Sequence, residues 1–261
     1  MSGRNIPITT ADGICQASLF APSGRPSGAA IILYMDAFGP RPAMDEMAAR
    51  LAGQGHAVLG PDLFYPFGAY GPFDAKTAFS NAETGQFLRR MIAETTQTMT
   101  MADTGFFLDA LAGEGFAGKI GTVGYCMGGG RALNAAAAFP DRIVAAASLH
   151  GGNLANGAPD SPAANAVKIK ARVYVGVAGV DGSFPPEQSA RLAQAFREAE
   201  VDHIVENYVG MKHGWCVPDH SVYDAAGAGR DWKRLEKLFG EAVGGGALGK
   251  KGWNVRHFPV A

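Results

Sequence analysis

The chain has 261 residues, of which 47% are hydrophobic and 18% charged, and its formal net charge is −1. This length suits one large α/β domain or two small ones, and the small net charge argues against nucleic acid or an anionic membrane surface as a partner. We expect no signal peptide and no membrane span, because no apolar run has the required position or length. Three widely spaced cysteines argue against a disulfide framework, so we expect a cytoplasmic protein.

Short apolar runs that end at glycine, proline or polar residues predict the strands, and apolar residues at helical spacing predict the helices. The first two strands flank an Ala-Asp-Gly turn and should form a hairpin. Strands are expected at 5–10, 14–20, 30–35, 56–60, 120–123, 144–149, 171–178 and 203–208. Helices are expected at 42–54, 86–112 (in one or two pieces), 131–138, 185–200 and 225–239.

Strands that alternate with helices predict an α/β fold with a mostly parallel sheet covered on both faces. We expect a single domain at 1–240, followed by a tail at 241–261 that packs on this domain or extends from it. Residues 63–85 are rich in aromatic residues, glycine and proline and predict a long loop. This loop is either a wall over the active site or an ordinary crossover with buried phenylalanines.

The segment 120–138 joins a predicted strand to a predicted helix through Gly124-Tyr125-Cys126-Met127-Gly128. This G-x-nucleophile-x-G pattern is typical of a nucleophile elbow, here with cysteine where serine is usual. Such a turn exposes the sulfur above the sheet and points the first N–H groups of the helix at the group under attack. The alternatives are a dinucleotide-binding turn, whose G-x-G-x-x-G spacing is missing, and a buried structural cysteine.

Four reactive side chains each follow within a few residues of a predicted strand end: Asp36, Cys126, Asp181 and His213. Ligands of parallel sheets bind at this carboxyl edge, so we expect the four to lie close together. The order Cys126, Asp181, His213 is the nucleophile–acid–base order of α/β-hydrolases. In that arrangement His213 handles the thiol proton, and Asp181 orients the imidazole.

The oxyanion would be held by the backbone N–H groups of Met127 and Ala37. His150 also follows a strand and is the rival base, although it precedes Asp181, against that order. The structural alternatives are a plain turn histidine at His213 and a turn-forming role for Asp181.

Cys216 lies close to His213 in sequence, but no further ligands follow at metal-binding spacing, so we expect no metal. Hydrolysis by this route needs no cofactor either. Asp219 and His220 are expected on the loop surface.

The chain resembles the dienelactone hydrolases, which are α/β-hydrolases with a cysteine nucleophile. The resemblance covers about residues 14–239 and rests on the segments IILYMDAFGP, GTVGYCMGGG, AGVDGSFPPEQ and VGMKHGW. It implies a triad of Cys126, Asp181 and His213. It also implies attack of Cys126 on the ester carbonyl of an enol-lactone, followed by hydrolysis of the thioester by water.

The chain departs from this family pattern in two places. Family members carry a glutamate at the position of Asp36 that bonds the resting thiol and helps to ionise it, whereas Asp36 is one methylene shorter. They also place arginines around the substrate carboxylate, one of them shortly after the catalytic histidine. This chain has no arginine directly after His213, and Arg89 and Arg90 are candidates for the family's other arginine.

We expect Phe38, Tyr65, Tyr125 and Trp215 to line a fairly apolar substrate pocket. The predicted function is hydrolysis of a carboxylic ester or lactone by a monomer or small homo-oligomer. The alternatives are a general short-chain carboxylesterase and a degenerate hydrolase fold that serves as a binding protein. A nicotinamide oxidoreductase is disfavoured by the missing glycine fingerprint.

Overall fold

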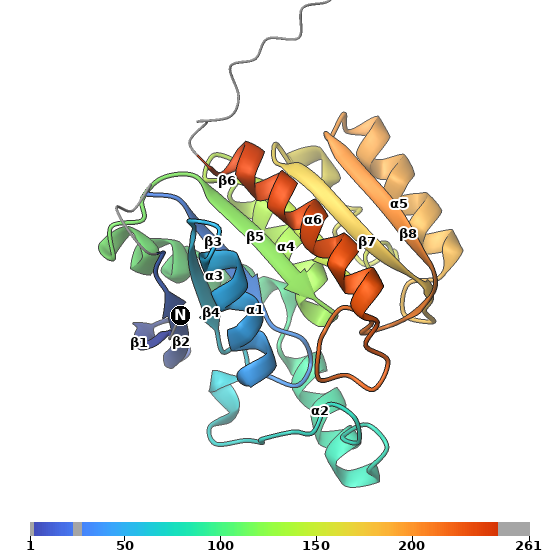
Figure 1. Cartoon of the computed structure of the whole chain (residues 1–261), viewed down its shortest axis with the longest axis horizontal. Helices are drawn as coiled ribbons and strands as arrows, with labels where there is room; N and C mark the ends of the chain where they lie inside the picture. Colours follow the sequence, from blue (N-terminus) through green and yellow to red (C-terminus); the bar gives the residue numbers. More distant parts are fainter. Residues whose placement is uncertain (1–2, 23–27, 245–261) are drawn as a thin grey trace, which may run out of the picture.

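A computed structural model describes residues 3–22 and 28–244 of the chain. Eight strands form one sheet in the order β1-β2-β4-β3-β5-β6-β7-β8 (Figure 1). The first two strands pair antiparallel, as does β2 with β4, and all other neighbours are parallel. The strands are β1 Arg4–Thr9, β2 Ile14–Phe20, β3 Ala30–Tyr34, β4 Ala57–Pro61, β5 Ile120–Tyr125, β6 Ile143–Leu149, β7 Arg172–Val180 and β8 His203–Lys212.

Helices cover both faces of this sheet. In Figure 1, α1 and α6 lie in front of the strands, while α4 and α5 lie behind them, and α3 packs against α4. The helices are α1 Pro42–Ala52, α2 Ala82–Glu94, α3 Gln97–Gly113, α4 Met127–Ala138, α5 Pro186–Glu198 and α6 Ala225–Ala242, with short 3-10 turns at Tyr65–Phe67 and Ala166–Lys168. The predicted hairpin and the mostly parallel sheet with helices on both faces are confirmed.

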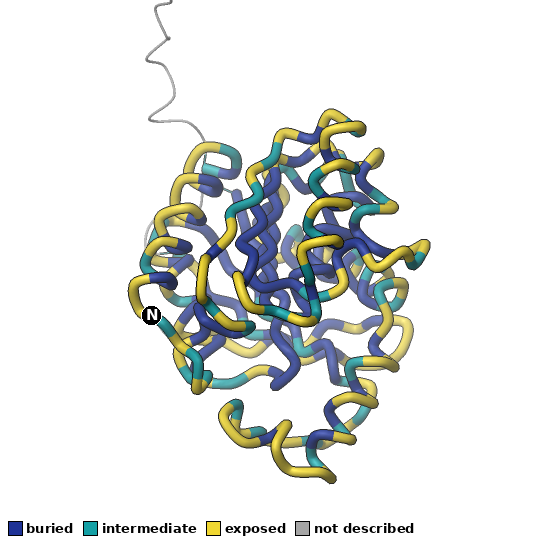
Figure 2. Tube along the Cα trace, turned by 90° about the vertical axis from the view of Figure 1, so that its right-hand side faces the viewer, coloured by how far each residue is buried: buried dark blue, intermediate teal, exposed yellow. Residues whose placement is uncertain are grey.

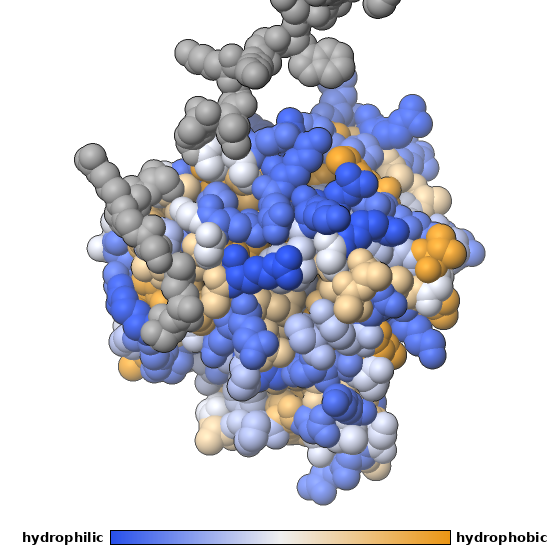
Figure 3. All heavy atoms as spheres, in the orientation of Figure 1, coloured by the Kyte–Doolittle hydropathy of each residue, from blue (hydrophilic) through white to orange (hydrophobic). Residues whose placement is uncertain are grey.

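Burial follows this layering. Every residue of β3 and of β5 is buried, because both central strands are covered on two faces, whereas the edge strand β1 alternates between exposed and buried residues (Figure 2). The view in Figure 3 is mainly hydrophilic, with only small, separate apolar areas. Within residues 3–22 and 28–244, no helix is both long and apolar enough to cross a membrane.

Several predicted boundaries differ from the observed ones. The helix α2 begins at Ala82, inside the predicted loop, because the Asn81 side chain accepts a hydrogen bond from the Thr84 N–H and caps it. The helix after the elbow begins directly at Met127 instead of at residue 131. The last strand continues to Lys212, because Gly210 takes a positive φ and the pairing with β7 shifts register near Val180.

The C-terminal end of the described chain also differs from prediction. Residues 241 and 242, assigned to a tail, are the last residues of α6. Residues 243 and 244 follow the helix, and the part of the expected tail from residue 245 onward lies outside the described residues.

Two long segments meet beyond the carboxyl ends of the strands. Figure 1 shows α2 and the segment before it at the bottom of the view, where the parallel strands end. The segment between β8 and α6 lies at the same edge of the sheet. These segments enclose the space above the predicted nucleophile.

Candidate active site

Cys126 lies in a strained turn between β5 and α4. Its backbone has φ 56° and ψ −118°, a conformation that residues other than glycine rarely adopt. A Cβ atom at Gly124 would collide with the carbonyl of Gly128, and one at Gly128 would collide with the carbonyl of Tyr34. Both glycines are therefore required by close backbone approach, and the turn holds the half-buried Cys126 side chain at the cavity.

Asp181 and His213 follow the ends of the neighbouring strands β7 and β8. The Nδ1 atom of His213 lies 2.7 Å from Oδ2 of Asp181. The other carboxylate oxygen accepts hydrogen bonds from the backbone N–H and the hydroxyl of Ser183, at 2.8 and 2.7 Å. Burial would raise the pKa of Asp181, but the contacts with His213 and Ser183 outweigh it and lower the pKa.

His213 also hydrogen-bonds to the thiol of Cys126, so it connects the carboxylate to the sulfur. Burial opposes protonation of its ring. The charge of a Cys126 thiolate and the contacts with Asp181 outweigh burial and raise the pKa of His213 to about 10. The arrangement therefore favours a protonated His213 ring beside Cys126 at neutral pH.

His150, the rival base, has a different environment. It is buried, and neither ring nitrogen has a hydrogen-bond partner among the described residues. Burial, together with the charges of His213 and His220, holds the pKa of His150 well below its usual value. Its ring packs edge-to-face on His213, with 4.8 Å between centroids, so it is a packing partner of that ring.

Cys126, Asp181 and His213 line one cavity of about 640 Å³. The same cavity is lined by Ala37 and Met127, the two predicted oxyanion donors. Phe38, expected in the substrate pocket, also lines this cavity. The remaining wall has an apolar part from Ala75, Phe79, Ile92, Ala93 and Val222, and a polar part that includes Thr95, Gln97, Arg131, Asn156, Asp160 and Ser161.

Five of the predicted substrate-binding residues lie outside this cavity. Tyr125 and Trp215 are buried in the core; Trp215 stacks on Tyr208 instead of facing substrate. The hydroxyl of Tyr65 bonds to Thr10 and Asp103, and none of these three residues lines the cavity. Arg89 and Arg90 sit on the exposed face of α2, where the Arg90 guanidinium lies near Glu94.

Asp36 is also placed differently from the expectation. Its carboxylate is completely buried and bonds to Arg41, to His220 and to the backbone of Phe38, and the thiol of Cys126 is not among its described partners. The sequence left open whether this shorter carboxylate takes the place of the family glutamate at the thiol, and in this structure its bonds go to Arg41, His220 and Phe38 instead.

Among the cavity-wall residues that sequence reasoning missed are two basic side chains, Arg131 and His220. The Arg131 side chain is buried and bonds to the carbonyl of Thr95, while its Nε finds no partner in the described part of the chain. Burial lowers the pKa of Arg131 to about 10, against the opposing charge of Asp160. The sequence did contain a signal for this residue, because Arg131 is the single charged residue of a helix made mostly of glycine and alanine.

His220 was assigned to the loop surface, but its side chain is 9% exposed and lines the cavity. Nothing in its local sequence marks it as buried.

No group of three or more His, Cys, Asp or Glu residues in 3–22 and 28–244 is arranged to hold a metal ion.

A mostly parallel sheet, with a strained strand-to-helix turn at the carboxyl end of a central strand, defines this protein as an α/β-hydrolase. The sequence model of the dienelactone hydrolase family matches residues 15–243, and the chain belongs to this family. Family and relatives together indicate a hydrolase that acts on esters or lactones.

Individual relatives are distant. A Synechocystis protein provisionally named a carboxymethylenebutenolidase is 24% identical over 218 residues, which cover 80% of this chain and 84% of that protein. The carboxymethylenebutenolidase of Rhodococcus opacus is 33% identical over 128 residues, 49% of this chain and 46% of that protein. A Klebsiella pneumoniae structure provisionally named a dienelactone hydrolase superposes with a TM-score of 0.80 at 20% identity, covering 92% of this chain and 98% of that one.

Proposed function

We propose that the chain hydrolyses a carboxylic ester or lactone with Cys126 as nucleophile, His213 as general acid and base, and Asp181 as the group that orients His213. The observation that carries this proposal is the run of hydrogen bonds from Asp181 through His213 to the Cys126 thiol inside one cavity. Membership of a hydrolase family supports it independently.

In the first half-reaction the Cys126 thiolate attacks the carbonyl carbon, and a C–S bond forms while the carbonyl oxygen becomes an oxyanion. The backbone N–H groups of Met127 and Ala37 stabilise this charge. The intermediate then collapses, the C–O bond to the alcohol breaks, and His213 gives its proton to the leaving oxygen. The product is a thioester on Cys126; with a lactone, the alcohol stays tethered to the acyl group.

In the second half-reaction His213, now neutral, takes a proton from water as the water oxygen attacks the thioester. The C–S bond breaks, and the acid leaves. The thiolate and the imidazolium are restored, so the cycle closes without a cofactor.

The cavity wall supports two substrate classes. The apolar part, which includes Phe38 and Phe79, suits a neutral ester with an aromatic or medium-length chain. The buried guanidinium of Arg131 suits a substrate that carries a carboxylate, such as an acidic lactone. An acidic lactone hydrolase is our first candidate, and a general carboxylesterase is the second.

A substrate panel with Arg131→Met separates these candidates. We expect the wild type to prefer an acidic lactone and the variant to lose about tenfold or more in kcat/KM on it, since a charge-assisted hydrogen bond contributes about 1.5–3 kcal/mol. A neutral ester is the internal control, because its turnover needs folded enzyme but no guanidinium. Equal losses on both substrates, or a wild-type preference for neutral esters, would favour the carboxylesterase.

An apolar pocket also predicts that aromatic or medium-chain esters are hydrolysed faster than acetate.

The nucleophile is tested with p-nitrophenyl acetate. We expect Cys126→Ala to be inactive and Cys216→Ala to keep its activity, because the Cys216 thiol is buried outside the cavity. A Cys126→Ala protein as active as wild type would place the nucleophile elsewhere. A wild type that is inert on a broad ester panel would favour the binding protein.

A further inference from the structure

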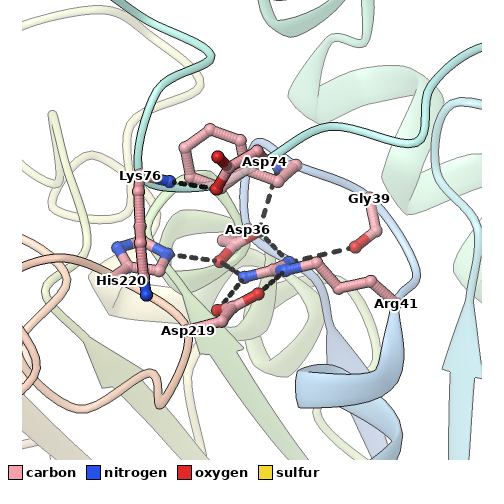
Figure 4. A network of polar contacts seen from close by, with 8 residues as sticks. Asp36, Gly39, Arg41, Asp74, Lys76, Asp219 and His220 are labelled. Carbon is pink, nitrogen blue, oxygen red and sulfur yellow. Dashed lines mark hydrogen bonds and ion pairs between the residues drawn. The ribbon is translucent and has the colours of Figure 1, made fainter.

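The carboxylate of Asp36 accepts four hydrogen bonds. Its Oδ1 atom accepts from the Phe38 N–H at 3.0 Å and from Nη1 of Arg41 at 2.7 Å. Its Oδ2 atom accepts from Nη2 of Arg41 at 2.8 Å and from Nε2 of His220 at 3.1 Å. Figure 4 shows Asp36 between the Arg41 guanidinium on one side and the His220 ring on the other.

These contacts leave Asp36 without a role as the base for the thiol. An ionised carboxylate offers about four lone-pair sites, and here all four are occupied. Burial alone would raise the pKa of Asp36, but the bonds to His220 and Arg41 outweigh it and lower the pKa to about 2. A carboxylate that acidic is a poor proton acceptor at neutral pH.

The same contacts join two loops of the cavity wall. Asp36, Phe38 and Arg41 belong to the loop after β3, whereas His220 belongs to the segment between β8 and α6. The His220 ring also packs edge-to-face on Phe38, with 5.3 Å between centroids. Both rings line the cavity, so the contact closes one side of it.

The loop after β3 carries Ala37, one of the two proposed oxyanion donors. Asp36 precedes it, and the Phe38 N–H that follows it is bound to the Asp36 carboxylate. This turn fixes the peptide planes on both sides of Ala37. Arg41 adds a bond to the Gly39 carbonyl at 3.1 Å, so the same guanidinium holds the far end of the loop.

We propose that Asp36 is a positioning residue, which, with Arg41 and His220, clamps the loop of Ala37 against the segment that follows His213. The clamp holds the Ala37 N–H at the place where the oxyanion forms, and it takes no part in ionising Cys126. The inference rests on the proposed function, since the oxyanion belongs to that reaction. Donors fixed in advance stabilise such a charge most strongly, because no reorganisation is needed when it appears.

The experiment compares Asp36→Asn with wild type by two readouts that separate positioning from ionisation. The first is hydrolysis of p-nitrophenyl esters, which needs the oxyanion hole. We expect kcat to fall about tenfold with KM nearly unchanged, because a displaced donor weakens the transition state more than substrate binding. The second is the pH dependence of Cys126 alkylation by iodoacetamide, which reports thiolate and needs no oxyanion hole. We expect this profile to match that of wild type.

Asp219→Asn is the matched control. Asp219 binds the same guanidinium at 2.5 and 3.0 Å, but its side chain is 36% exposed, and no hydrogen bond among the described residues joins it to Asp36 or Phe38, the two residues that flank Ala37. We expect this variant to keep wild-type kcat. If kcat fell as much in Asp219→Asn as in Asp36→Asn, the cause would be a general loss of negative charge around Arg41. That result would overturn the proposal.

Hydrogen exchange gives a readout that needs no substrate. In Asp36→Asn we expect faster exchange in peptides covering 36–41 and also 213–222, with no change in β6. Unchanged exchange at 213–222, or an alkylation profile shifted to higher pH, would overturn the clamp. If the wild type hydrolyses no ester, the proposed function fails, whereas exchange and alkylation still decide whether Asp36 joins the two loops.

Discussion

Two Asp–His pairs each place a histidine on the wall of the same cavity, and they differ in what else holds the carboxylate. In the first, Asp181 bonds to His213 at 2.7 Å, and its remaining partners are the neutral donors of Ser183. In the second, Asp36 bonds to His220 at 3.1 Å, but the full positive charge of Arg41 holds both of its oxygens. The charge of Asp181 is thus left to stabilise an imidazolium, whereas that of Asp36 is already compensated.

The two histidines also differ, in their exposure to solvent and in the residue that each ring contacts. The side chain of His213 is 31% exposed, and its ring bonds to the Cys126 thiol, whereas that of His220 is 9% exposed and packs on Phe38. An Asp–His pair at the carboxyl edge of a sheet is therefore not enough to identify an acid–base catalyst. The carboxylate must lack a competing cation, and the imidazole must reach the nucleophile.

The largest difference between the two pairs is expected when each histidine is replaced by glutamine. We expect His213→Gln to lower kcat/KM about a thousandfold, because glutamine neither accepts the thiol proton nor returns it. His220→Gln should lower it less than about tenfold, since the amide still donates a hydrogen bond to Asp36. Steady-state kinetics on one ester measures both. Losses of equal size would mean that the two pairs share the chemistry.

Asp181→Asn tests the charge of the first pair through its pH profile. The carboxylate helps to raise the pKa of His213 to about 10, so its removal should bring that pKa down. The imidazolium that protonates the leaving alcohol is lost as pH rises through this pKa, so the alkaline limb of kcat/KM should move to lower pH. We also expect about a hundredfold lower activity at pH 7. An alkyl ester is the required substrate, because nitrophenolate leaves without a proton; an unmoved limb would contradict the assignment.

In the second pair, the charge of Asp36 should contribute to the free energy of unfolding. The pKa of Asp36 falls from 3.8 to about 2 on folding, so its stabilising contribution is complete above pH 4 and is lost as pH falls toward 2. The shift corresponds to about 2 kcal/mol. Urea unfolding should therefore show a difference between wild type and Asp36→Asn that is constant above pH 4 and shrinks below it.

Much of the fold could be predicted because its signals are local. Apolar runs gave the eight strands, and alternation with helices gave the parallel sheet. The errors fall at element ends, where tertiary contacts decide. The strand β8 outlasts its apolar run, since pairing with β7 carries it to Lys212.

The site was predictable as far as it depends on strand ends. Topology brings the ends of β5, β7 and β8 to one edge, and Cys126, Asp181 and His213 lie together there. Side-chain direction was not predictable. Tyr125 and Trp215 are beside the key residues in sequence, yet both point into the core. The partners of Asp36 were equally hidden, because His220 is 184 positions away in sequence.

Ser183→Ala is the finest test of the first pair. The hydroxyl of Ser183 donates to Asp181 and lies 3.3 Å from Nδ1 of His213, so it holds the carboxylate in line without supplying charge. One neutral hydrogen bond contributes about 1 kcal/mol, and we expect about a fivefold loss in kcat/KM. The alkaline limb should stay in place, because Asp181 keeps its charge and the Ser183 backbone N–H still binds it. A limb that moves as far as in Asp181→Asn would show that the hydroxyl, and not the carboxylate charge, sets the pKa of His213. The difference between the two pairs could then no longer be explained by the charge of their carboxylates.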